Sequence, residues 1–160
     1  RPAVADMTAL AEALELRLRE KLREDLGGTY SVGVSGGVAR DPYPRYTFSI
    51  DFGSAPERVD ELVRVVMAEI DTVRAAGVPR DVVDKVRESA RRSRETALRE
   101  NGWWIGRLMD YDRQGWDVRL IPDNPINADL SSERIQAAAR LYLDPARHVQ
   151  VTLQPESASP

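Results

Sequence analysis

The sequence predicts an α+β domain of two layers, in which an antiparallel sheet packs against several helices. Two stretches of alternating apolar and polar residues follow one another closely, which is typical of a β-hairpin. Five other stretches repeat apolar residues at three- and four-residue steps, which is typical of helices. Alternation returns at residues 148–153. The predicted order of elements is therefore αββααααβ, with a C-terminal strand that closes the sheet.

Length and composition bound the number of domains and the class of protein. The chain has 160 residues, of which 42% are apolar and 31% charged, and its net charge is −3. These values are ordinary for one globular domain of this size, and the acidic balance argues against nucleic acid as a partner. No apolar run approaches the roughly 20 residues of a membrane span. We expect a single domain over residues 1–160, with a flexible tail over 156–160.

The first helix and the hairpin account for the first third of the chain. The helix is predicted to run from Asp6, a residue type that often caps helices, to about Asp25. The two strands are predicted over about 29–38 and over 46–52, joined by a proline-containing turn over 40–45. The helix carries one apolar stripe, which comprises Met7, Leu10, Leu14, Leu18 and Leu22.

Four more helices and one strand are predicted after the hairpin. A capping-box sequence at Ser54 opens the first helix, which Gly77 ends. The next two are predicted over about 79–100 and 103–114, and a loop follows them. Ser131 caps the last helix, and residues 148–153 should form the closing strand, with Val149, Val151 and Leu153 on one face.

The segment LREDLGGTYSVGV, residues 22–34, joins the first helix to the first strand. Gly27-Gly28 breaks the helix, at a place where positive φ costs glycine least. Arg23 lies just before this corner and Tyr30 just after it, so both can lie at one end of the helix–sheet layer. A guanidinium and a phenol can donate hydrogen bonds to a carbonyl or an oxyanion. From these residues alone a structural explanation is the better one, because arginine favours the negative end of the helix dipole and a tyrosine at a strand start keeps its hydroxyl in water.

Few residues of the chain suit metal or nucleophile chemistry. His148 is the one histidine and there is no cysteine, so no zinc site of the usual kind can be built. We expect His148 to be a solvated strand residue. A Ser-His-Asp hydrolase is disfavoured because no G-x-S-x-G motif is present. The glycine-containing segment 35–37 could suggest a phosphate loop, but no helix start follows it, and a flexible hairpin or a bulge is the better interpretation.

The segment REDLGGTY, followed by a hairpin and by PERVDELV, resembles the C-terminal half of the insulinase/pitrilysin family of zinc peptidases. It is most similar to bacterial members related to the pyrroloquinoline-quinone-associated peptidases. The segments RENGWWIGRL, SSERIQAAARLYLDP and VQVTLQP extend the resemblance over nearly the whole chain. The family pairs a zinc-bearing half, marked by HxxEH, with a zinc-free half of similar fold. The resemblance implies that Arg23 and Tyr30 match the arginine and tyrosine that the zinc-free half supplies to the shared active site.

This resemblance implies that the chain is a C-terminal fragment of a larger zinc metalloendopeptidase and is inactive alone. Zinc would be held by the HxxEH-bearing half, in the same protein or in a partner subunit, and the two halves would close over an extended peptide. The resemblance places the protein in the bacterial periplasm or cell envelope, with the cytoplasm as an alternative. Family domains open with a strand before the first helix, so an exposed sheet edge here could support a homodimer. The alternative function is a proteolytically inactive scaffold or a peptide-binding module of the same fold.

Overall fold

The computed structural model describes residues 2–24, 31–39, 42–122 and 129–153. Five helices and one two-stranded antiparallel sheet make up this described part, which confirms the predicted α+β class. The elements are α1 (Pro2–Glu24), β1 (Val32–Ala39), β2 (Arg45–Phe52), α2 (Val59–Ala76), α3 (Arg80–Ala97), α4 (Asn101–Gln114) and α5 (Ser132–Tyr142), with the short 3-10 helices η1 (Pro56–Arg58) and η2 (Val118–Leu120).

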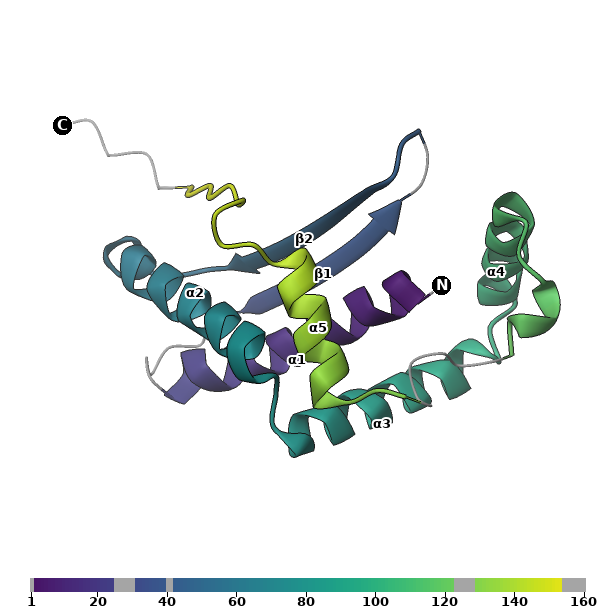
Figure 1. The fold of residues 1–160 in the computed structure, drawn as a ribbon, viewed down its shortest axis with the longest axis horizontal. Helices are drawn as coiled ribbons and strands as arrows, with labels where there is room; N and C mark the ends of the chain where they lie inside the picture. The colour runs from purple at the N-terminus through teal and green to yellow at the C-terminus, as the bar shows by residue number, and fades with distance from the viewer. Residues whose placement is uncertain (1, 25–30, 40–41, 123–128, 154–160) are drawn as a thin grey trace.

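Helix α1 lies at the centre of the packing, in contact with β1, α2, α3 and α5 (Figure 1). The predicted apolar stripe is confirmed, because its five side chains from Met7 to Leu22 are at most 1% exposed. The helix begins at Pro2, so the predicted start at Asp6 is wrong. Asp6 instead pairs with Arg134 of α5, with 2.6 Å between Oδ1 and Nε.

The hairpin covers one side of α1. Strands β1 and β2 pair in one continuous register, from Val32 opposite Phe52 to Ala39 opposite Arg45. The glycine-containing segment 35–37 therefore belongs to a regular strand of the predicted hairpin and forms no bulge. A Cβ at Gly36 would lie 2.5 Å from Cγ of Met7. Glycine at this position therefore lets the sheet approach the helix closely.

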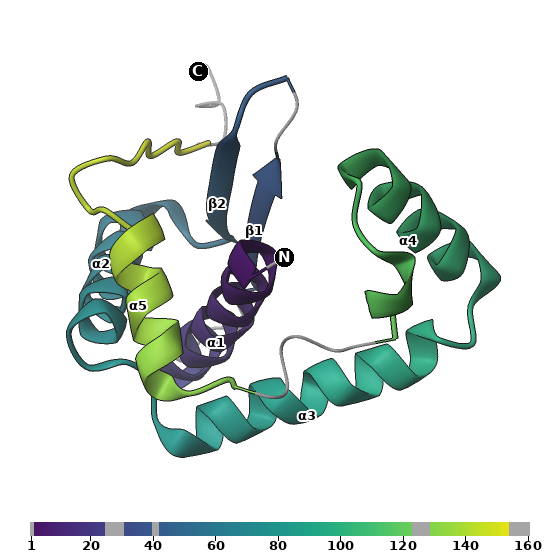
Figure 2. The ribbon, with the colours of Figure 1, turned by 45° about the vertical axis from the view of Figure 1, so that its right-hand side comes forward.

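Helices α2 and α5 complete the helical layer beside α1, whereas α3 crosses below and leads to α4, which stands apart (Figure 2). The inner faces of α2 and α5 carry deeply buried residues, such as Leu62, Val73 and Ile135. Oγ of Ser131 accepts a hydrogen bond from the backbone N–H of Arg134, as its predicted capping role requires. The capping box predicted at Ser54 is not formed, because the chain enters α2 through η1 without a side-chain cap.

The predicted closing strand over residues 148–153 is wrong. This segment forms no strand, and the sheet of the described residues contains β1 and β2 alone. Val149, Val151 and Leu153 would occupy the buried face of such a strand, but they are 89%, 77% and 93% exposed. Alternation of residues produces a strand only where a neighbour satisfies the backbone hydrogen bonds, and no described strand lies beside this segment. His148 is exposed, as predicted, with Nδ1 2.7 Å from the carbonyl oxygen of Pro145.

Gly77→Ala is expected to destabilise the protein more than Gly115→Ala. Both glycines have positive φ, but Gly77 has ψ −152°, in a region that is essentially restricted to glycine, whereas Gly115 is left-handed helical. A Cβ at Gly77 would also clash with Oγ of Ser132, whereas one at Gly115 would meet nothing within 4 Å. Left-handed backbone alone costs alanine about 1–2 kcal/mol. Chemical denaturation of the two variants measures the difference, and equal losses would contradict this account.

Candidate functional site

The structure describes one of the two residues of the predicted site, at the C-terminal turn of α1. Position 23 lies in this last turn, one residue before the helix ends at Glu24. Tyr30 falls outside the described residues. The helix end at Glu24 agrees with the predicted end near residue 25. Its pairing with Tyr30 stays a prediction.

An open groove of about 650 Å³ runs along one face of α1, between this helix, β1 and α3. Arg19 lines the groove, and position 23 follows it by four residues, which is about one helical turn on the same face of the helix. The polar lining from the three elements includes Thr8, Glu12, Arg19, Ser35, Lys85 and Ser89. Sequence reasoning missed this groove, although polar residues at three- and four-residue steps on α1 could have indicated it.

The charges of the groove are largely paired within it or at its edge. Arg19 bonds to Glu15 one turn before it on α1, and Nζ of Lys85 lies 3.0 Å from Oδ2 of Asp81 on α3. The hydrogen bond between Lys85 and Asp81 raises the pKa of the lysine and lowers that of the aspartate. The groove therefore has no concentrated charge and suits a ligand whose hydrogen-bonding groups are spread along its length.

The opposite face of α1 is joined to α2 by an ion-pair cluster. Nε of Arg17 donates a hydrogen bond of 2.7 Å to Oε1 of Glu69, and Nζ of Lys21 lies 3.7 Å from Oε2. Glu69 is 1% exposed. The hydrogen bond that Arg17 donates to Glu69 raises the pKa of Arg17 against the opposing effect of burial. Arg17 and Lys21 lie one turn apart, so the cluster fixes the C-terminal part of α1 against α2.

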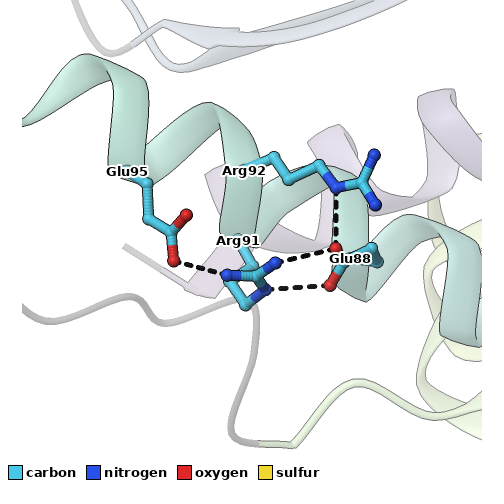
Figure 3. A network of polar contacts seen from close by, with 4 residues as sticks. All are labelled: Glu88, Arg91, Arg92 and Glu95. Atoms are coloured by element: carbon cyan, nitrogen blue, oxygen red, sulfur yellow. Dashed lines mark hydrogen bonds and ion pairs between the residues drawn. The ribbon is translucent and has the colours of Figure 1, made fainter.

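The outer face of α3 carries a network of charged side chains. Arg91 forms two hydrogen bonds of 2.8 Å to the carboxylate of Glu88 and a third to Glu95, while Nε of Arg92 donates to Glu88 at 2.7 Å (Figure 3). All four side chains lie on the solvent-facing side of the helix. This is a salt-bridge-laced surface, and it does not form a basic stripe for nucleic acid.

The network on α3 predicts a specific pH dependence. Hydrogen bonds from Arg91 and Arg92 lower the pKa of Glu88 from 4.5 to about 2. A carboxylate whose pKa falls on folding stabilises the protein fully above its unfolded value, and this contribution is lost as the pH falls through about 2. Glu88→Gln should therefore lower the melting temperature slightly at pH 7 and low salt, and by less near pH 2. Thermal melts at both pH values test this, and a difference that is independent of pH would contradict it.

Helix α4 carries aromatic residues that pack at its start. The rings of Trp103 and Trp104 meet edge to face with centroids 5.3 Å apart, and the guanidinium of Arg94 lies 4.5 Å above the Trp103 ring. Both tryptophans are half-buried. Ile105 and Met109, one turn apart, are 59% and 68% exposed.

Neither a metal centre nor a membrane span is found in the described part of the chain. No group of three or more histidine, cysteine, aspartate or glutamate residues is placed there to hold a metal ion. Among the same residues, no helix has the length and apolar character that crossing a bilayer requires. The arrangement of central helix, hairpin and flanking helices thus defines an α+β domain with a polar groove and no metal-ligand cluster in the residues described.

Comparison with known proteins assigns this domain to a family. The family model described as the peptidase M16 inactive domain matches residues 4–90, which is more than half of the chain. The chain therefore belongs to the peptidase M16 family, as an inactive-type domain. The predicted resemblance to the zinc-free half of these zinc peptidases is confirmed.

A solved structure shares the fold. The periplasmic protease PqqL from Escherichia coli superposes with a TM-score of 0.67 over 89% of this chain, at 22% sequence identity. At this identity the likeness shows the fold alone. This chain spans 16% of the length of the PqqL chain. No curated protein sequence matches the chain.

Proposed function

We propose that this chain is the non-catalytic half of a zinc metalloendopeptidase, which closes over an extended peptide and donates Arg23 and Tyr30 to an active site whose zinc another domain holds. The observation that carries the proposal is the family match over residues 4–90. The position of Arg23 at the end of α1, one turn beyond the groove-lining Arg19, supports it. The other domain would be an HxxEH-bearing half, in the same protein or in a partner subunit.

The proposed chemistry of this half is hydrogen-bond donation. Arg23 and Tyr30 would donate to substrate carbonyls or to the oxyanion that forms during cleavage, where one donor is typically worth about 10²- to 10³-fold in rate. With one histidine and no cysteine, the residues of this chain do not fit a zinc site. No step of the reaction is therefore assigned to a metal held here. The groove along α1 suits a peptide, because the main chain presents donors and acceptors at regular intervals.

The domain boundaries, the compartment and self-association are part of the same proposal. One core of buried side chains extends from Ala9 to Leu143, which supports a single domain within a larger peptidase. The fold shared with PqqL, which is a periplasmic protease, supports the bacterial periplasm or cell envelope. A homodimer through a sheet edge is supported by the two-stranded sheet, because neither outer edge pairs with a described strand.

Peptide cleavage by the intact zinc-bearing protein tests the proposed function. A quenched, unstructured peptide should be cleaved, a zinc chelator should stop cleavage, and added zinc should restore it. This chain alone, with or without zinc, should cleave nothing. Cleavage by the metal-stripped chain would overturn the proposal. If the intact protein binds the peptide and cleaves it under no metal condition, the inactive scaffold or peptide-binding module becomes the better account.

A further inference from the structure

One carboxylate occupies a place on α2 where an apolar side chain would be expected. Glu69 lies in the buried face of this helix and is 1% exposed. It is the one buried charged or polar side chain among the described residues. The other buried residues of the helix are Leu62, Val66, Ile70 and Val73. Burial of a carboxylate costs free energy unless it is paired and hydrogen-bonded, so its presence here calls for a physical reason.

The partners of Glu69 lie on α1, and both come from the part of the helix that leads to Arg23. Oε1 accepts a hydrogen bond of 2.7 Å from Nε of Arg17, and Oε2 lies 3.7 Å from Nζ of Lys21. Oε2 has no hydrogen bond, so the ion pair with Lys21 is its electrostatic compensation. Two contacts one turn apart restrict both the rotation of α1 about its axis and its sliding along α2.

Stability alone does not account for this cluster. Replacement of a buried ion pair by well-packed apolar residues is often neutral or stabilising. Leu18 and Leu22, which are 0% and 1% exposed, already bury the same end of α1. Apolar packing is non-directional, whereas a charge-assisted hydrogen bond has a preferred geometry. The cluster therefore adds orientation to an end of the helix that is already buried.

The oriented segment carries a residue of the proposed active site. Arg17, Lys21 and Arg23 lie within two turns of α1. We infer that Glu69 is a positioning residue, which through Arg17 and Lys21 holds the C-terminal turn of α1, and with it Arg23, in the orientation that peptide cleavage requires. This inference rests on the proposed function of Arg23.

Three variants separate positioning from stability. Glu69→Leu removes the directional contacts and keeps a buried side chain of similar size, whereas Glu69→Gln removes the charge and keeps the shape. Asp6→Asn is the matched control, because Asp6 pairs with Arg134 at 2.6 Å and tethers the other end of α1 to α5. The side chains of this control pair are 24% and 25% exposed.

Kinetics of the intact zinc-bearing protein give the first readout. Glu69→Leu should lower the melting temperature, because Arg17 and Lys21 lose their partner. Measured at a temperature where the variant is still folded, its kcat for a quenched peptide should fall about 10- to 100-fold with KM little changed, because small misplacements can cost this much. In an Arg23→Ala background the same substitution should have no further effect. Asp6→Asn should leave kcat unchanged. A kcat that stays at the wild-type value in Glu69→Leu, or that falls equally in both backgrounds, would overturn the inference.

Hydrogen exchange gives a second readout that does not need catalysis. In Glu69→Leu, the backbone amides of residues 17–22 should exchange faster, while those of residues 7–14 keep their wild-type rates. If Glu69→Leu does not fold, Glu69→Gln takes its place in both experiments. Absence of cleavage by the wild type would count against the proposed function. The exchange rates would then still show whether Glu69 anchors the C-terminal part of α1. Unchanged exchange over residues 17–22 would overturn the inference.

Discussion

Replacement of Arg23 by alanine in the intact peptidase is expected to lower peptide cleavage by about 10²- to 10³-fold, the typical effect of losing one oxyanion donor. Position 23 is in the last turn of α1 and is not one of the stripe residues, from Met7 to Leu22, that hold the helix in the core. The stability of the fold should therefore change little. Tyr30→Phe, which removes one hydroxyl, should lower the rate in the same way. Cleavage of a quenched peptide, with binding of the peptide measured separately, checks both variants.

A control arginine shows whether the effect is specific. Arg92 lies on the exposed face of α3, where it bonds to Glu88 at 2.7 Å. Arg92→Ala removes an equal charge far along the chain from the α1 corner and should leave the cleavage rate unchanged. Equal rates for wild type and Arg23→Ala would show that Arg23 has an ordinary structural role at a helix end. A loss of folding in Arg23→Ala would also contradict the assignment.

Leu14→Ala is expected to have the largest effect on stability, with a loss of about 2–5 kcal/mol in the free energy of unfolding. Leu14 is 0% exposed and lies in the middle of α1, the helix that β1, α2, α3 and α5 surround. Truncation there leaves a cavity that several elements line, and a rigid neighbourhood can close it only in part. Denaturant unfolding followed by circular dichroism measures the loss.

The same substitution on the surface provides the comparison. Leu141 lies on α5 and is 68% exposed, so Leu141→Ala should change the free energy of unfolding by no more than about 0.5 kcal/mol. Both variants remove the same atoms from a leucine in a helix. Similar losses for the two would mean that α1 is not the centre of the core.

Local pattern was sufficient to predict the helices and the hairpin. The stripe from Met7 to Leu22 predicted α1 because helical geometry brings residues at three- and four-residue steps to one face. The strict alternation over 46–52 predicted β2, and its partner β1 followed from the short turn between them. Helix starts were predicted less well: α1 begins at Pro2, before Asp6, and α2 is entered through η1. Several residues near a helix start can act as caps, and tertiary packing selects among them.

Features that depend on distant parts of the chain were not predictable in this way. The alternation over 148–153 suggested a strand, but a strand needs a partner, which the sequence of the segment does not specify. The polar groove arises because α3 passes beside α1, and Glu69 can be placed against Arg17 only when α1 and α2 are packed. The pairing of Arg23 with Tyr30 came from family resemblance, since helix and strand periodicity say nothing of catalysis.

The most direct test of the central claim is to add this chain to the zinc-bearing half and to measure cleavage of a quenched peptide. The account predicts that neither part cleaves appreciably alone, and that cleavage rises with added chain until the zinc-bearing half is saturated. The chain with Arg23→Ala should bind this half without restoring the cleavage rate. Full activity of the zinc-bearing half without this chain would contradict the account, because the active site would then be complete in one half.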